Sequence, residues 1–147
     1  MILAFIIPLW FNRCFNHGKI KVYAEKKYIG YMWNACEEWN SAEKVFYPTC
    51  DKSKADVTIE SGYNKKTAYA ITYQDGRILI NEKLWQKADT DIKRQIITHE
   101  LGHTLGLHHA EGKGADNSVM YKVVFGRKIT KKDKKIFKKY YRQRFKK

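Results

Sequence analysis

The stretch THELGHTLGLHHAEG, Thr98–Gly112, holds four of the five histidines of this 147-residue chain. It continues a segment from Asp89 onward in which apolar residues recur every three or four positions, the period of an α-helix. Asp89 or Thr90 can cap the predicted helix, and Gly106 can end it, because glycine adopts the left-handed conformation that stops helices. The predicted buried stripe consists of Ile92, Ile96, Ile97, Leu101 and Leu105.

Two histidines of this helix are spaced to bind one metal ion. His99 and His103 are four residues apart, so they lie on the same face of the helix and both imidazoles can reach one ion. Glu100 is rotated by about 100° around the helix axis, so its carboxylate flanks the ion within reach of an activated water molecule. This pattern indicates a catalytic metal site rather than a purely structural one.

A third protein ligand is expected, because a catalytic zinc ion takes three ligands from the protein and keeps one position for water. Gly106 lets the chain leave the helix axis, and His109 can then fold back toward the same ion. A continuous helix would instead carry His109 about 15 Å beyond His99. The adjacent His108 could compete as a ligand, but His109 has the spacing after Gly106 that such motifs require.

The segments HELGHTLGLHH and SVMY together resemble the metzincin metallopeptidases, and within them the matrixin-like group. The resemblance implies a zinc-dependent endopeptidase with one catalytic zinc ion, bound by His99, His103 and His109. It also implies that Glu100 takes a proton from the attacking water and returns a proton to the departing amine. The partner would be a protein or peptide substrate.

The SVMY segment adds two residues to the predicted site. Met120 matches the methionine of the family's Met-turn, which runs beneath the zinc and forms its hydrophobic floor. Tyr121 follows it directly and is predicted to shape the wall of the substrate pocket. The resemblance further implies an α+β fold of the zincin type. Such a fold has a twisted, mostly parallel sheet with an antiparallel edge strand, an active-site helix, a Met-turn and a C-terminal helix.

Patterns elsewhere in the chain predict the same mixture of elements. Alternation of polar and apolar residues predicts strands, and a turn is expected at Gln74–Gly76. Helical periodicity over Tyr28–Ala42 predicts an amphipathic helix. The predicted strands are Lys19–Glu25, Lys44–Pro48, Ala55–Ser61, Thr67–Gln74 and Arg77–Trp85. The apolar positions of the helix are Ile29, Met32, Trp33, Cys36 and Trp39.

The strand Thr67–Gln74 resembles the antiparallel edge strand above the cleft of the family. An extended substrate would pair with its exposed edge, predicted at Ala68–Tyr73. The alternative is an ordinary core strand. The preceding loop Ser61–Thr67 contains no His or Asp, so the structural zinc and calcium sites of animal matrixins are predicted to be absent. The predicted substrate-binding residues of the strand are Ala68, Tyr69, Ala70 and Ile71.

The N-terminus is strongly apolar. Met1–Phe11 has the length of the hydrophobic part of an export signal, which predicts a leader-like segment over residues 1–18 and a secreted or cell-surface protein. The alternative is a hydrophobic first strand. Residues 19–147 would form the catalytic domain. Cys36 and Cys50 could form a disulfide in an oxidising compartment or could be small buried residues, and Cys14 would be left over.

The basic charge is concentrated at the C-terminus. Of a net charge of +14, Arg127–Lys147 contributes twelve basic residues and one acidic residue. A helix is predicted over Thr130–Lys147, with Thr130 and Asp133 in the positions of a capping box. It is either a closing helix with a solvated basic surface or a tether for an anionic polymer or membrane surface. Its apolar stripe consists of Ile136, Phe137, Tyr140, Tyr141 and Phe145.

A function of another class is also compatible with this charge. The chain could be a basic module that binds a membrane or nucleic acid and carries a secondary metal site. The position of Glu100 beside the histidines and the SVMY segment favour the peptidase. We therefore expect a monomeric enzyme with no stable nucleic-acid partner.

Overall fold

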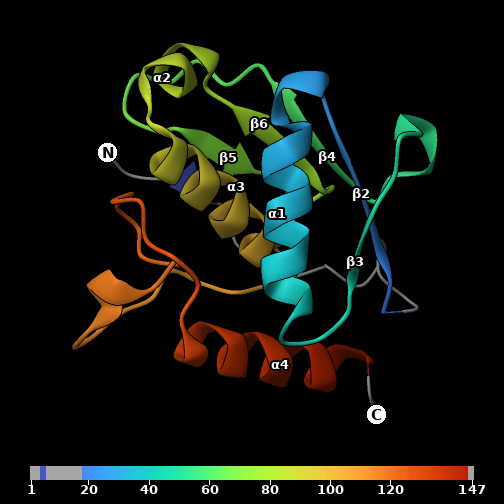
Figure 1. The fold of residues 1–147 in the computed structure, drawn as a ribbon, viewed down its shortest axis with the longest axis vertical. Coiled ribbons are helices and arrows are strands. Elements are labelled where there is room, and N and C mark those ends of the chain that lie inside the picture. The colour runs from blue at the N-terminus through green and yellow to red at the C-terminus, as the bar shows by residue number, and fades with distance from the viewer. Residues whose placement is uncertain (1–3, 6–17, 146–147) are drawn as a thin grey trace.

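Six strands form one sheet in the computed structural model, which describes residues 4–5 and 18–145, and helices pack against this sheet (Figure 1). The fold is therefore α+β, as predicted. The strands are β1 (Ala4–Phe5), β2 (Ile20–Ala24), β3 (Phe46–Pro48), β4 (Val57–Ser61), β5 (Ala70–Thr72) and β6 (Arg77–Ile80). The α-helices are α1 (Ile29–Asn40), α2 (Glu82–Lys87), α3 (Thr90–Thr104) and α4 (Lys131–Phe145). Short 3-10 helices span Lys26–Tyr28, Lys52–Lys54 and Ala115–Asn117.

The sheet is mostly parallel, with strand order β1-β5-β6-β4-β2-β3. Only β5 and β6 pair in antiparallel fashion, whereas all other neighbouring strands of the described sheet are parallel. This arrangement confirms the predicted mostly parallel sheet with one antiparallel strand toward its edge.

Strand β5 is shorter than predicted and is not the outermost strand of the described sheet. The predicted strand spans Thr67–Gln74, but hydrogen-bonded pairing with the neighbouring strands covers only Ala70–Thr72. Beyond β5 lies β1, with Ala4 opposite Ile71 and Phe5 opposite Thr72 in parallel register. The rest of the predicted leader up to residue 17 lies outside the described residues.

A tight turn connects β5 to β6, as predicted from Gln74–Gly76. The N–H of Tyr73 donates to the carbonyl of Arg77 (2.7 Å), and the N–H of Gly76 donates to the carbonyl of Tyr73 (3.1 Å). Gly76 has a φ of 90°. A Cβ atom there would lie 2.2 Å from the carbonyl oxygen of Asp56, so this position requires glycine.

The predicted strand over Arg77–Trp85 is wrong in its second half. β6 ends at Ile80, and Asn81 caps α2 by accepting a hydrogen bond from the N–H of Leu84 (3.3 Å). The amide of Asn81 also donates to the carbonyl of Ala68 (3.2 Å), which fixes the start of β5. An asparagine after an apolar run is a helix-start signal, and the continuous apolar pattern masked it.

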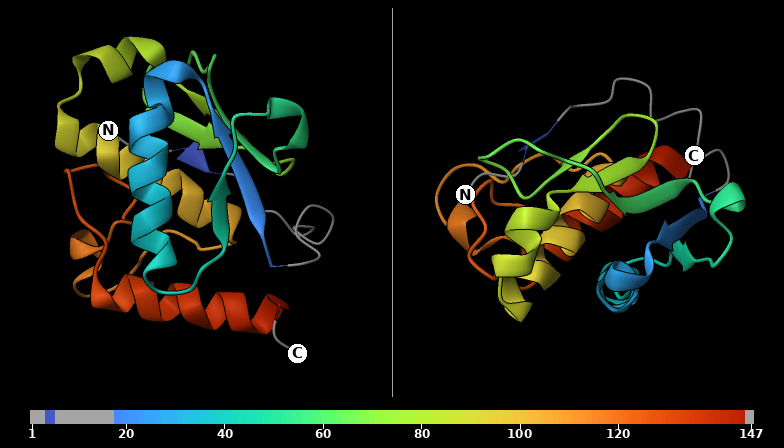
Figure 2. Two further views of the ribbon diagram at one scale, coloured as in Figure 1. Left: turned by 45° about the vertical axis from the view of Figure 1, so that its right-hand side comes forward. Right: turned by 90° about the horizontal axis from the view of Figure 1, so that it is seen from above.

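Helices α1 and α3 lie side by side against the sheet, and α4 crosses below their C-terminal ends (Figures 1 and 2). Trp39 of α1 joins the three helices. Its Nε1 donates to the carbonyl of Thr98 in α3 (2.8 Å), and its ring stacks on Phe137 of α4 at 4.6 Å between ring centroids. All three residues are fully buried, so this contact closes the core beneath the histidine segment.

The apolar stripe of α1 is narrower than predicted. Met32, Cys36 and Trp39 are buried, but Ile29 is 39% exposed and Trp33 is 51% exposed. The helix buries only the face that meets α3 and the sheet, so apolar residues at the margins of the stripe remain in solvent.

The two cysteines that the structure describes do not pair. Cys36 is buried and Cys50 is exposed, and both are free thiols, so the disulfide hypothesis is wrong. Burial raises the pKa of the Cys36 thiol to about 12, which keeps it protonated and unreactive. Cys14 lies outside the described residues.

Helix α4 begins with the predicted capping box. The N–H of Asp133 donates to Oγ1 of Thr130 (3.1 Å), and the N–H of Thr130 donates to Oδ2 of Asp133 (2.9 Å). Of the predicted apolar stripe, Phe137 is fully buried and Ile136 is 37% exposed. No helix in the described part of the chain combines the length and apolarity needed to cross a bilayer.

Candidate metal centre

Two histidines meet on the buried part of α3. The carboxylate of Asp89 caps this helix by accepting from the N–H of Ile92 (2.8 Å). Every residue from Gln95 to Thr104 is buried, which the one-sided apolar stripe did not predict. Within this segment, the Nε2 atoms of His99 and His103 lie 2.9 Å apart.

Backbone carbonyls fix the tautomers of these two rings. Nδ1 of His99 lies 2.9 Å from the carbonyl oxygen of Val119, and Nδ1 of His103 lies 2.7 Å from that of Leu107. A carbonyl can only accept, so each Nδ1 carries the proton, and each Nε2 of a neutral ring presents a lone pair. Two lone pairs that face each other at this distance repel unless a cation lies between or beside them. The donor set therefore fits a metal ion.

The third histidine arrives through the turn at Gly106, as predicted. Gly106 has a φ of 96°, its N–H donates to the carbonyl of His103 (2.9 Å), and the next N–H, of Leu107, donates to that of Gly102 (3.2 Å). The ring centroid of His109 then lies 5.0 Å from that of His103.

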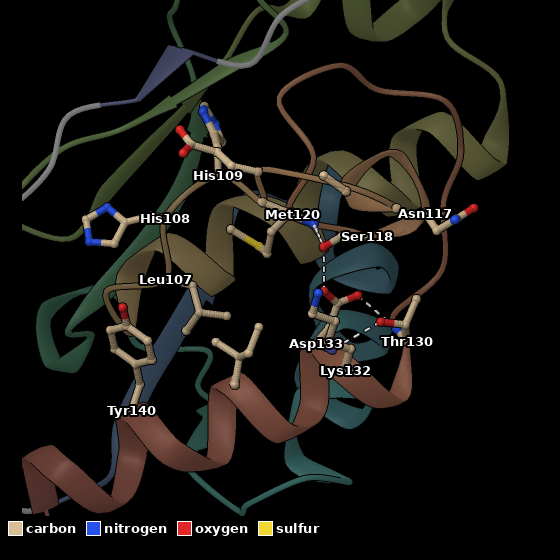
Figure 3. Close-up of a pocket in the computed structure, with 15 residues that line it drawn as sticks. Leu107, His108, His109, Asn117, Ser118, Met120, Thr130, Lys132, Asp133 and Tyr140 are labelled. Atoms are coloured by element: carbon tan, nitrogen blue, oxygen red, sulfur yellow. Dashed lines mark hydrogen bonds between the residues drawn. The ribbon is translucent and has the colours of Figure 1, made fainter.

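One ligand atom from each of the three histidines lies within 4.8 Å of the others. The exposed His108 is outside this group, and Figure 3 shows its ring pointing away from His109.

Burial keeps the histidines neutral. It lowers the pKa of His99 to about 3, and the nearby His109 adds to this shift. Burial likewise lowers the pKa of His103 well below its usual value, and His99 adds to that shift. Burial also lowers the pKa of the less enclosed His109. Neutral imidazoles are the form that binds metal, so the site is ready for an ion at neutral pH.

Met120 packs directly against α3 at a glycine. A Cβ atom on Gly102 would lie 2.5 Å from Sδ of Met120 and 3.1 Å from Trp39. The carbonyl of Met120 accepts from the N–H of Ala110 (2.9 Å), which ties it to the residue after His109. The methionine thus packs against the helix that carries His99 and His103, and its role as the floor of a metal site stays a prediction (Figure 3).

Helix α4 anchors the turn that carries Met120, through contacts that no sequence pattern predicted. The hydroxyl of Ser118 donates to the carboxylate of Asp133 (Figure 3). The same carboxylate also accepts from the N–H of Val119 (3.1 Å). Ser118 in turn accepts from the N–H of Met120 (3.0 Å). Since the Val119 carbonyl holds His99, Asp133 supports a ligand from the far side of the turn. The capping-box pattern predicted that Asp133 caps α4, but it did not predict that Asp133 also binds Ser118 and Val119.

Glu100 lies in a fully buried position on α3. Its Oε2 accepts a hydrogen bond from the hydroxyl of Thr72 in β5, and its Oε1 has no partner among the described residues. Burial raises the pKa of this carboxyl to about 8, and the hydrogen bond from Thr72 opposes the rise. A metal ion close by would also oppose it, because positive charge favours the carboxylate. Thr72 is a second residue that sequence patterns did not reveal.

Comparison with known families decides the assignment. The profile of the matrixin family, peptidase family M10, matches residues 66–142, which is more than half of the chain. The chain belongs to the matrixin family. No curated protein matches it significantly.

Matrixins are zinc metallopeptidases, and the three-histidine cluster of this matrixin fits zinc. Three histidine nitrogens that lie close to one another are a ligand set that zinc binds in proteins. The absence of structural zinc and calcium sites stays a prediction.

The residues predicted to bind substrate lie in two places. Ala68, Ala70 and Ile71 are buried in or beside β5, so only their backbone could pair with an extended peptide. Tyr69 is partly buried, and its carbonyl accepts from the N–H of Asn81 (2.7 Å). Tyr121 is partly exposed after Met120. A substrate role for these residues stays a prediction.

The segment that follows Tyr121 is tied back to α3. Gln95 is fully buried, and its Oε1 accepts from the backbone N–H groups of Phe125 (3.0 Å) and Arg127 (2.6 Å). The ring of Phe125 stacks near that of Tyr121, at 6.2 Å between centroids. The sequence offered one indication that Gln95 is buried, which is its position directly before Ile96 and Ile97 of the apolar stripe.

A pocket of about 440 Å³ lies between the loop of residues 107–118 and α4 (Figure 3). Leu107 and Tyr140 contribute apolar walls, and His108 and Lys132 contribute polar ones. The predicted apolar stripe of α4 is thus shared between the core and this pocket.

Proposed function

We propose that this matrixin is a zinc-dependent endopeptidase that hydrolyses internal peptide bonds of proteins. The proposal rests on one observation above all. The buried Glu100 carries a carboxylate oxygen that has no partner in the part of the chain that the structure describes, and it lies on the same helix as two of the histidines that fit zinc. A structural metal site has no use for a buried carboxylate, whose charge is costly to desolvate, whereas a hydrolytic site needs a base.

His99 and His103 would hold the ion through their Nε2 atoms, and His109 would hold it through one of its ring nitrogens. Zinc, when bound, supplies a water that ionises near neutral pH and a positive charge that polarises the substrate carbonyl. The Val119 and Leu107 carbonyls keep the rings of His99 and His103 oriented with their Nε2 atoms facing each other.

Glu100 moves the proton. Oε1 accepts a proton from the attacking water, and the same carboxyl then delivers a proton to the nitrogen of the departing amine. Burial raises the pKa of the Glu100 carboxyl, whereas a zinc ion held nearby would lower it again, because positive charge favours the carboxylate that accepts the proton.

An extended substrate would pair with the sheet beside β5. Backbone pairing along a strand reads a chain in mid-sequence and needs no free terminus, which supports endopeptidase activity. In the described structure, β1 occupies the position beside Ile71 and Thr72. A substrate that uses this edge would take the place of β1.

The test is Glu100→Gln in the full chain. We expect zinc content equal to wild type, because the ligands are untouched, and a loss of peptide hydrolysis of about 10² to 10⁴-fold, the range for a general base. Zinc content would be measured by elemental analysis, and hydrolysis by the fragments released from unfolded casein.

Chelation should abolish the wild-type activity, and added zinc should restore it. Hydrolysis by Glu100→Gln at the wild-type rate would refute the assigned base. Release of terminal residues alone would refute endopeptidase activity.

A second part of the proposal concerns the basic surface of α4. Lys131, Lys135, Lys139 and Arg142 are exposed at helical spacing, and the only acid of the helix, Asp133, is buried. We propose that this face binds an anionic membrane surface and that the enzyme acts as a monomer outside the cell, as matrixins typically do. No stable nucleic-acid partner is part of the proposal.

Vesicles test this surface. Vesicles with anionic lipid should bind the protein and vesicles of neutral lipid should not, and binding should weaken as salt rises. Lys135→Glu with Lys139→Glu should reduce binding and leave hydrolysis of a small peptide unchanged. Equal binding to anionic and to neutral vesicles would refute the proposal that this face binds an anionic membrane surface. Salt-sensitive binding by a chain that hydrolyses no peptide would favour the alternative, a basic binding module with a secondary metal site.

A further inference from the structure

The hydrogen bond between Thr72 and Glu100 connects two elements of the site that are far apart in the chain. Thr72 is the last residue of β5, and Glu100 lies in the middle of α3. The Thr72 hydroxyl also lies 3.4 Å from the backbone carbonyl of Glu100, but Oε2 of the carboxylate is closer. A hydroxyl has one hydrogen to donate, and the charged, nearer oxygen is the stronger acceptor.

The position of Thr72 is itself fixed. It is 2% exposed and pairs with Ile78 in the antiparallel ladder of β5 and β6. Its branched Cβ restricts the rotation of the side chain. The sheet therefore fixes the backbone of Thr72, and the branched Cβ restricts the positions that its hydroxyl can take.

The two carboxylate oxygens of Glu100 consequently have different surroundings. Oε2 is held by Thr72, and Oε1 has no partner among the described residues. A buried carboxylate fixed at one oxygen keeps the other oxygen available in a defined direction. Without the hydroxyl, the Glu100 side chain could rotate about its terminal torsion, which is intrinsically broad.

We propose that Thr72 is a positioning residue that orients the Glu100 carboxylate for its role as the base. This inference rests on the proposed function of Glu100. It also gives β5 two roles, because the strand that would pair with the substrate backbone holds the base as well. A displacement of β5 by a poorly fitting substrate would then disturb the base directly.

The test compares three variants of the full chain. Thr72→Val removes the hydroxyl at nearly constant shape, and Thr72→Ser keeps the hydroxyl. Thr58→Val is the control, because Thr58 lies in β4 of the same sheet and its buried hydroxyl has no partner among the described residues.

We expect Thr72→Val to lower kcat by about 10- to 100-fold, a part of the contribution of a general base, with KM changed less than about twofold. Zinc content should equal that of wild type. Thr72→Ser should recover most of kcat, and Thr58→Val should match wild type. A purely structural role would instead change zinc content or thermal stability together with kcat.

Crystal structures of the zinc-free proteins supply a readout that needs no activity. The Glu100 carboxylate should have one orientation in wild type and in Thr72→Ser, and more than one in Thr72→Val. If the wild-type chain hydrolyses no peptide, the proposed function fails, and this comparison still tests Thr72.

The inference is overturned if Thr72→Val keeps kcat within about twofold of wild type with an unchanged carboxylate. It is also overturned if Thr72→Ser loses as much activity as Thr72→Val. Should Thr72→Val fail to fold, Thr72→Ala takes its place with the same expectations.

Discussion

Gly106 has a φ of 96°, and this angle determines where the third histidine lies. A residue with a side chain strongly disfavours this conformation, whereas glycine does not. The turn at Gly106 ends α3 and redirects the chain within three residues, so that His109 reaches the other two rings. The geometry of the metal centre thus depends on a residue that contributes no ligand.

Replacing Gly106 with alanine should therefore weaken zinc binding. The substitution costs about 1–3 kcal/mol of strain, and relief of that strain would move the segment leading to His109. We expect zinc affinity to fall by about tenfold or more, measured by competition with a chromogenic chelator.

Gly112→Ala is the matched control. Gly112 has a φ of 84° and open space around its Cβ position, but it follows His109 in the chain. The Gly112→Ala variant should be less stable than wild type but should bind zinc with the same affinity. Equal zinc affinities in the two variants would contradict the role assigned to Gly106.

At the scale of elements, α3 organises its neighbours as well as the metal ligands. It is capped by Asp89, contacts Met120 at Gly102 and holds the segment after the Met-turn through Gln95. The segment Gln95–Thr104 of this helix is buried on all sides, so it can form such contacts in several directions. The amphipathic pattern revealed only the apolar face.

Gln95→Leu should destabilise the protein. Leucine has a similar volume but leaves the N–H groups of Phe125 and Arg127 without their acceptor, which costs about 1–3 kcal/mol for part-buried donors. We expect a lower midpoint in urea unfolding of the zinc-free protein. The exposed Gln86, changed to leucine in the same way, should have little effect. An unchanged midpoint for Gln95→Leu would show that these two bonds do not stabilise the fold.

At the scale of the whole molecule, burial shifts the pKa values of basic and acidic groups in opposite directions at one site. Burial lowers the pKa values of His99 and His103 and raises that of Glu100, because each group is driven toward its neutral form. These shifts make the stability of the zinc-free protein depend on pH in both directions.

The zinc-free protein should be most stable near pH 6.5. Between about pH 3 and 6.5 the unfolded chain binds more protons at His99, so the free energy of unfolding falls as pH falls. Between 4.5 and about 8 the folded protein binds more protons at Glu100, so the free energy falls as pH rises. Below pH 6.5 the two buried histidines have a larger combined effect on the free energy of unfolding than the one carboxyl, so the net result is a loss of stability as pH falls.

Urea unfolding across this range measures the effect, and Glu100→Gln is the control. That variant should lose the part of the decline between pH 6.5 and 8 that Glu100 causes. If its stability declined as steeply as that of wild type over this interval, the carboxyl would not be the group responsible.

A feature of this protein could be predicted from the sequence when it depends on residues that lie close together in the chain. The helix of His99 and His103, its cap at Asp89 and its end at Gly106 were predictable, because they depend on residues close in the chain. The same holds for the capping box of α4. The strand predicted through Trp85 failed because periodicity alone did not separate a buried strand from the short helix that follows Asn81.

The sequence by itself determined the family, the three histidines, Glu100 and the order of most elements, because local spacing and backbone preference encode them. Only the tertiary structure decided which groups hold these residues in place. Thr72 reaches Glu100 across 28 positions, Asp133 reaches Ser118 across 15, and Gln95 reaches Arg127 across 32. No local pattern encodes such contacts, because they exist only after the sheet, α3 and α4 have packed around one core.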